Sequence, residues 1–322
     1  MEILSYFSTY QFYILGLILN TENKTKQLSL SALLDKSTKH IRKFLRKTVN
    51  FDELFLKLIG ILDIDLVKGY FIIDGTVYSK AYSRVLKNLY SLFSSSNKSY
   101  TKGYEVILLC WSNGKITLPI SFKIWHRDLP KSQLDVAMEL IKYARDISKD
   151  KNLGFRIDAF FNAKKILGYL QKNHIFFATR LGKGRLFFQE GKKMNLKSTS
   201  FGKKCIKGWL PGIGYVWATK YKGKYYCANR RPDSQKQLYQ WYTERWDIEC
   251  VFRFVKSELK LEHCQGFEFI QHHNHIGYCF LAYALLRAMF PDINAYEAKR
   301  RMQSELVKKS VSLKPKGKKL CA

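Results

Sequence analysis

One stretch of the chain combines a carboxylate, a phenol and several cations at regular spacing. Residues 242–256 read YTERWDIECVFRFVK and place Tyr242, Arg245, Glu249 and Lys256 at offsets of 0, 3, 7 and 14. On one continuous helix these positions fall within an arc of roughly 60°, and Arg253 joins the same face. An acid that binds a divalent metal, beside cations that hold phosphates, suits chemistry on a phosphodiester. A surface helix in which Glu249 pairs with Arg245 or Arg253 would show the same pattern.

Two further acids follow short apolar runs that are typical of β-strands. Asp74 follows Tyr70–Ile73, and Asp158 follows Leu153–Ile157. Open α/β sheets bind ligands at the carboxyl ends of their strands, so both aspartates are candidates for one site. An acid in this place is also a common helix cap, so the two aspartates alone do not establish a site.

The segments around these acids predict a mixed α/β fold. Two strand-like runs, Glu105–Trp111 and Ile116–Trp125, are joined through Asn113-Gly114, which predicts a hairpin. Helices are expected at Ser132–Ile147, Ala163–Gln171, Ser234–Lys260 and Ile276–Met289, a strand at Ile175–Thr179, and mostly β structure over Leu186–Asn229.

The first 66 residues read as helical. Ser37 can cap a helix on which Ile41, Phe44 and Leu45 form an apolar stripe and basic residues fill the other face. A helix-turn-helix unit and a basic bundle helix both explain this pattern. The apolar run Phe12–Leu19 is about half as long as the roughly 20 residues that cross a bilayer. We therefore expect a buried helix there and no membrane association.

The charge balance favours a polyanionic partner. The chain has 322 residues, with 56 Lys and Arg against 26 Asp and Glu, a formal net charge of +30. From Lys183 to Trp209 the basic residues stand against one acid, Glu190, and aromatic residues are interleaved among them. Such a run can neutralise phosphates and stack on exposed bases, although a solvated strand surface also explains it. Seven scattered cysteines form no disulfide framework and suit a reducing interior. Together with a nucleic-acid partner, this predicts a cytoplasmic, nucleoid-associated protein.

The spacing Tyr242-x2-Arg245-x3-Glu249-x6-Lys256 resembles the signature of DDE transposases encoded by bacterial insertion sequences. The resemblance is to the branch with a long β-rich insertion before the glutamate. The segment IIDGTVYSK around Asp74 resembles that family's first-acid strand. FRIDAFFNAKKILGYLQKN, around Asp158, resembles its second-acid strand and following helix. The resemblance covers roughly residues 70–289.

This resemblance implies a ribonuclease H-like core in which Asp74, Asp158 and Glu249 are catalytic and hold two Mg²⁺ ions, with Mn²⁺ able to substitute. It implies that Tyr242, Arg245 and Lys256 bind phosphates near a transposon end, and Arg253 is added from its helix face. The implied reaction is cleavage of transposon ends and transfer of the strands into target DNA. The expected partners are double-stranded DNA, both inverted-repeat ends and target, and a second copy of the chain in a homodimer on paired ends.

Five domains are expected on this basis: 1–66, helical and DNA-binding; 67–182, the first part of the core; 183–233, the β-rich insertion; 234–290, the helices that carry Glu249; and 291–322, a basic tail. Two other functions stay open. A stand-alone nuclease of the same fold would cleave without joining strands, and a DNA-binding remnant would lack catalysis.

Overall fold

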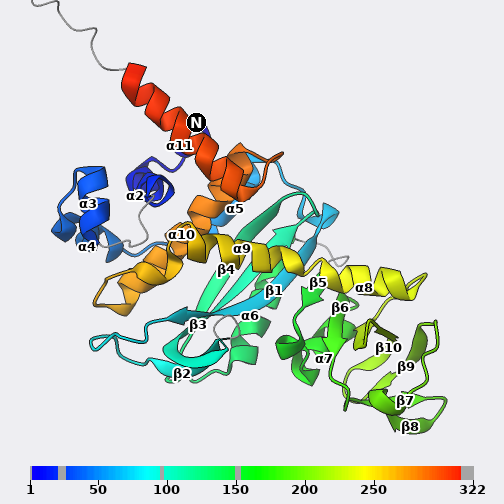
Figure 1. The fold of residues 1–322 in the computed structure, drawn as a ribbon. Helices are drawn as coiled ribbons and strands as arrows, with labels where there is room; N and C mark the ends of the chain where they lie inside the picture. Colours follow the sequence, from blue (N-terminus) through cyan, green and yellow to red (C-terminus); the bar gives the residue numbers. More distant parts are fainter. Residues whose placement is uncertain (1, 21–26, 95–97, 149–153, 313–322) are drawn as a thin grey trace, which may run out of the picture. The chain divides into compact units, whose positions relative to one another are not determined.

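The computed structural model describes residues 2–20, 27–94, 98–148 and 154–312 (Figure 1). It is a mixed α/β structure, as the sequence predicts. Residue contacts divide the chain into two compact units. Residues 50–252 form one of them, here called the sheet unit. Residues 1–49 and 253–322 form the other, called the helical unit.

The sheet unit is built on one large mixed sheet, which has eleven strands in the described part of the chain. The strands are β1 (Tyr70–Ser79), β2 (Tyr90–Ser94), β3 (Ser99–Ser112), β4 (Thr117–Trp125), β5 (Gly154–Ile157), β6 (Phe176–Leu181), β7 (Leu186–Gln189), β8 (Lys192–Asn195), β9 (Ile206–Leu210), β10 (Gly214–Tyr221) and β11 (Lys224–Ala228). Their order is β2-β3-β1-β5-β6-β11-β10-β9-β7-β8, with β4 paired to β3.

The centre of this sheet contains its parallel strands. β5 lies between β1 and β6 and pairs with both in parallel, whereas β1 pairs with β3 antiparallel. The predicted hairpin is confirmed, because β3 and β4 are antiparallel neighbours joined through the Asn-Gly turn. The Asn113 side chain accepts hydrogen bonds from the backbone N–H groups of Lys115 and Ile116, and Gly114 adopts φ +83°. Glycine suits this position because residues with a Cβ rarely adopt positive φ.

Helices pack on the sheet at several places. They are α5 (Phe51–Ile61), α6 (Gln133–Ser148), α7 (Lys164–Lys172), α8 (Gln235–Thr243) and the start of α9 (Trp246–Ser257). α6 contacts β1, β3 and β4. Its spacing predicts an apolar face of Leu134, Val136, Leu140, Ile141 and Ala144; the last four are buried, and Leu134 is half-buried. Ser132 and Asp135 exchange hydrogen bonds at its first turn, which explains why the helix begins there.

The helical unit is organised around one long helix. Its elements are α1 (Glu2–Ser5), α2 (Ser8–Leu19), α3 (Gln27–Leu34), α4 (Thr38–Leu45), α10 (Phe269–Met289), α11 (Ala295–Ser312) and the end of α9. α10 contacts α1, α2, α4 and α11 and is buried along most of its length. Buried polar groups join these helices: Tyr13 hydrogen-bonds His275 at 2.8 Å, and Asn274 donates to the carbonyl groups of Leu45 and Lys47.

The predicted helix after Ser37 is confirmed as α4. The Ser37 side chain accepts a hydrogen bond from the His40 N–H, and Ile41, Phe44 and Leu45 are buried. The run Phe12–Leu19 lies in α2, whose buried residues include Ile14 and Leu17. Among the described helices, none combines the length and the apolar character that crossing a membrane requires. Of the predicted basic tail, residues 295–312 form α11, and residues 313–322 lie outside the described part.

Candidate active site

Asp74 lies inside β1, not at its end. The expectation that the strand stops at Ile73 is wrong because β3 continues to pair with β1 as far as Ser79. The parallel ladder does stop there, since the pairing of β1 with β5 ends at Ile73 and Ile157. Asp74 and Asp158 are therefore the residues that directly follow the last parallel pair of β1 and β5. This is the edge at which parallel strands present polar groups to a ligand.

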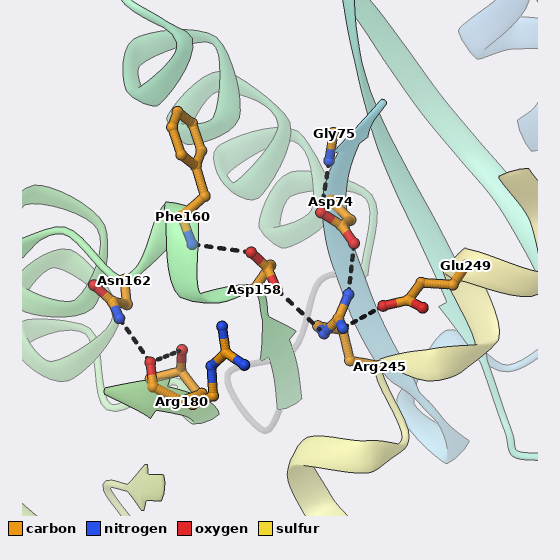
Figure 2. A network of polar contacts seen from close by, with 9 residues as sticks. Asp74, Gly75, Asp158, Phe160, Asn162, Arg180, Arg245 and Glu249 are labelled. Atoms are coloured by element: carbon orange, nitrogen blue, oxygen red, sulfur yellow. Dashed lines mark hydrogen bonds and ion pairs between the residues drawn. The ribbon is translucent and has the colours of Figure 1, made fainter. Parts of the chain in front are cut away.

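Asp158 directly follows β5 and begins a short 3-10 helix, Ala159–Phe161. Its Oδ2 atom accepts a hydrogen bond from the Phe160 N–H at 2.9 Å. Its other oxygen, Oδ1, faces the Arg245 guanidinium (Figure 2). Asp158 is thus both a cap and a site residue, so the two interpretations of this acid from sequence are compatible.

The predicted single helix over Ser234–Lys260 is wrong at its middle. The chain forms α8 as far as Thr243 and α9 from Trp246, with Glu244 and Arg245 between them. At this junction the Arg245 N–H donates to the Tyr242 carbonyl group and the Ile248 N–H to the Arg245 carbonyl group. These bonds span three residues instead of four, as in a 3-10 turn. The 60° arc expected of one continuous helix therefore does not hold across the junction.

The break places the Arg245 guanidinium among the three acids (Figure 2). Nη1 lies 2.6 Å from Oδ2 of Asp74, and Nε lies 3.5 Å from Oδ1 of Asp158. Nη2 pairs with Oε1 of Glu249, one turn further along α9. Three carboxylates from β1, the end of β5 and α9 therefore converge on one cation, and all four residues belong to the sheet unit.

The electrostatics of this cluster leave negative charge uncompensated. Burial, followed by the nearby Asp158 carboxylate, raises the pKa of Asp74 from 3.8 to about 7, although Arg245 acts in the opposite direction. One guanidinium cannot neutralise three carboxylates, and Asp74 keeps its proton up to near neutral pH. The cluster consequently favours further positive charge, and hard carboxylate oxygens are the ligands that Mg²⁺ and Mn²⁺ prefer.

The Arg245 guanidinium contacts all three carboxylates. Within the described ranges, no group of three or more His, Cys, Asp or Glu side chains is arranged to hold a metal ion as it stands. The three carboxylates are of a type that binds divalent cations. In this structure they are arranged around the Arg245 guanidinium.

Two part-buried sets of contacts hold the junction between α8 and α9 on the sheet. Oδ2 of Asp247 accepts hydrogen bonds from Tyr70 at 2.9 Å and from Ser112 at 2.7 Å. Glu244 forms an ion pair with Arg156 at 2.5 Å, and the Arg156 side chain is only 7% exposed. Because Arg245 lies between Glu244 and Asp247 in the chain, these contacts position its backbone on the sheet.

The other predicted DNA-binding residues lie in different surroundings. Tyr242 packs on α8 against Phe176 and Tyr226, with the Arg245 guanidinium 5.5 Å from its ring centre. Burial raises the pKa of its phenol. Arg253 and Lys256 belong to the helical unit. Arg253 is exposed, and Lys256 forms an ion pair with Glu262 at 3.1 Å.

The pairing of Glu249 with Arg245 is the contact that a salt-bridged surface helix would also make. Such a helix does not explain why the same guanidinium contacts Asp74 and Asp158, or why Arg245 is only 9% exposed. The sequence interpretation missed Arg156, Glu244 and Asp247. Arg156 gave one signal, because a charged residue inside a short apolar strand needs a buried partner.

Comparison with known proteins places the chain in a family. The Transposase DDE domain family matches residues 68–285, about two thirds of the chain, so the protein belongs to this family. Its fold is similar to that of piggyBac transposase in a cryo-EM structure of the synaptic complex with hairpin DNA. The TM-score is 0.51 at 10% sequence identity, over 97% of this chain and 73% of that chain. No curated protein matches the sequence.

Proposed function

We propose that the protein is a metal-dependent DNA transposase of the bacterial insertion sequence type. In this proposal a ribonuclease H-like core cleaves transposon ends and transfers the strands into target DNA. One observation carries the proposal: Asp74, Asp158 and Glu249 converge on a single cation. Membership of the Transposase DDE domain family supports it, since domains of this family use divalent metal ions.

Asp74, Asp158 and Glu249 would hold two Mg²⁺ or Mn²⁺ ions. Bound in this way, the ions would activate the attacking hydroxyl group and stabilise the leaving oxygen of a phosphodiester. The chain contributes the three carboxylates from three separate elements. With the carboxylates holding metal ions, Arg245 would bind a phosphate of the DNA through its planar guanidinium. Tyr242, Arg253 and Lys256 are assigned to phosphates near the transposon end.

The proposal extends to the partners and to the domains. Double-stranded DNA is the partner, as inverted-repeat ends and as target, and a homodimer acts on paired ends. The strongly basic composition, +30 overall, supports a polyanionic partner. Residues 1–66 are proposed to bind DNA, and residues 183–233 are proposed as an insertion into the core that residues 67–182 and 234–290 form.

The proposal is tested with purified protein, Mg²⁺ and DNA that carries the inverted repeats next to its own gene. We expect nicking at the repeat ends and joining of the freed 3′-hydroxyl groups to a second DNA. Glu249→Gln should abolish both, because it removes one carboxylate ligand. The isosteric control Glu139→Gln, on the exposed face of α6, should leave both unchanged.

Two outcomes contradict the proposal. Full activity of Glu249→Gln would show that Glu249 is not a ligand. Nicking without any joining would point to a nuclease of this fold instead of a transposase.

A further inference from the structure

The strands β7 to β10 carry aromatic side chains on one exposed face. Trp209 is 43% exposed and Tyr215 57% exposed. The opposite face of the same strands is buried, with Phe187 and Leu210 inaccessible and Val216 1% exposed. Successive side chains of a strand point to opposite faces of the sheet, so these strands have one packed face and one face with solvent-exposed aromatic rings.

The pairing register places three rings and one lysine in a single row across four strands. Lys193 of β8 pairs with Phe188 of β7, Phe188 pairs with Trp209 of β9, and Trp209 pairs with Tyr215 of β10. The Trp209 and Tyr215 ring centres are 5.1 Å apart, with the ring planes at 80°. Residues paired across strands share a face, so the row is continuous from β8 to β10.

A second row lies beside the first. Lys207 of β9 pairs with Trp217 of β10, on the same face as Trp209 and Tyr215 because the positions alternate along each strand. Trp217 is half-buried, and α8 packs on β10 and β11 beyond it. The side chains of these two rows are here called the aromatic face: Lys193, Phe188, Trp209 and Tyr215 in the first row, and Lys207 and Trp217 in the second.

Cations lie directly over the rings of the aromatic face. The Lys207 ammonium is 5.2 Å from the centre of the Tyr215 ring, and the Arg231 guanidinium is 5.4 Å from the Trp217 ring. Residues 191–231 contain no Asp or Glu, whereas Lys and Arg recur along them. The aromatic face is therefore apolar and π-rich in its middle and positive around it.

We propose that the aromatic face binds single-stranded DNA. Rings on a flat sheet can stack on unpaired bases, and the surrounding cations can neutralise the phosphates between them. A duplex keeps its bases stacked on one another and offers mainly phosphates, so it would use the cations and not the rings. A protein partner would not explain why acidic residues are absent from this stretch. The choice of DNA over RNA rests on the proposed function.

The inference is tested by fluorescence anisotropy with a labelled oligo-dT and a labelled duplex, using the full chain in EDTA so that no DNA is cleaved. Stacking of one base on an aromatic ring strengthens binding between about 5-fold and about 150-fold, so Trp209→Ala should weaken oligo-dT binding by a factor in this range. Tyr215→Ala should act in the same direction, and duplex binding should change less than twofold in both variants. Trp209→Phe should restore most of the affinity, because it keeps a ring.

Two further variants separate rings from charge. Lys207→Gln should reduce the slope of log Kd against log salt for oligo-dT by about 0.7, because it removes one phosphate contact. Tyr82→Ala is the matched control, since Tyr82 is 98% exposed and lies outside β7–β11. It should bind oligo-dT as the wild type does.

The inference is overturned if Trp209→Ala leaves oligo-dT binding within twofold of the wild type, or weakens single strand and duplex equally. A change in oligomeric state by light scattering, with oligo-dT binding intact, would make the face a protein interface and would also overturn it. If the variants show the expected losses of oligo-dT binding but the wild type cleaves no DNA in Mg²⁺, the proposed function is contradicted and the single-strand binding site is not.

Discussion

Arg245→Gln should destabilise the metal-free protein and make its stability strongly dependent on divalent ions. The Arg245 side chain is 11% exposed and that of Asp74 is 14% exposed, so the substitution leaves buried carboxylates without their partner. Removing one member of a buried ion pair costs about 3–5 kcal/mol. We take about 3 kcal/mol, the lower end of that range, because the Glu249 side chain is 30% exposed.

This free energy corresponds to a measurable change in melting temperature. A domain of 150–250 residues loses about 2–4 °C for each kcal/mol, so the Tm of the variant should fall by about 6–12 °C in EDTA. Adding Mg²⁺ or Ca²⁺ should raise the Tm of the variant more than that of the wild type. On the proposed function, an ion would compete with the Arg245 guanidinium for the carboxylates in the wild type, whereas the variant would offer it three carboxylates without a competing cation.

The measurement is thermal unfolding followed by circular dichroism, in EDTA and over a series of ion concentrations. Arg301→Gln is a matched control, because Arg301 pairs with Glu305 four residues away, as Arg245 does with Glu249, but on an exposed surface. An exposed pair of this kind contributes about 0.2–1 kcal/mol at most. An equal loss of Tm for Arg245→Gln and Arg301→Gln in EDTA would contradict the prediction. So would an ion that raises the Tm of Arg245→Gln no more than that of the wild type.

Three further predictions concern the sheet unit. In EDTA, the pKa of Asp74 is about 7 in the folded protein, against 3.8 for an ordinary aspartate. Between pH 4 and pH 7 the folded protein therefore holds a proton on Asp74 that the unfolded chain has lost. Its free energy of unfolding should therefore fall as pH rises from 4 to 7, and urea titrations should show this slope reduced in Asp74→Asn. Glu244→Ala should lower the free energy of unfolding by about 3 kcal/mol, since it leaves the buried Arg156 guanidinium unpaired, and an isosteric Glu244→Gln should recover part of the loss. A Cβ on Gly103 would lie 2.2 Å from the Tyr78 carbonyl oxygen, whereas one on Gly60, in α5, would meet no atom within 4 Å. Gly103→Ala should therefore destabilise the protein, and Gly60→Ala should stabilise it by about 0.5–1 kcal/mol; equal effects in urea denaturation would contradict the described backbone contact.

Local pattern was sufficient for much of the fold. The β3–β4 hairpin, helix α6 with its buried face, and the Ser37 cap of α4 were all predictable, because turn chemistry, side-chain periodicity and capping act over a few residues. The mixed α/β class followed from the alternation of such segments.

The arrangement of the active site was only partly predictable. The residue types of Asp74, Asp158 and Glu249 are readable from the chain. Helical periodicity could not show that α8 ends before Arg245, because the Asp247 and Glu244 contacts that hold this junction come from β1, β3 and β5, which are distant in sequence. It likewise could not show that β1 continues past Asp74, since this depends on the length of β3.

The chemistry available to this protein is readable from its chain: an excess of cations for a polyanion, and three acids with an arginine. The position of Arg245 and the exposure of the aromatic residues depend on the folded sheet. Phe187 and Phe201 are buried, whereas Trp209 and Tyr215 are exposed, although all four occur in the same basic stretch or next to it. Exposure and charge pairing depend on neighbouring strands, and the register of those strands is a property of the whole sheet.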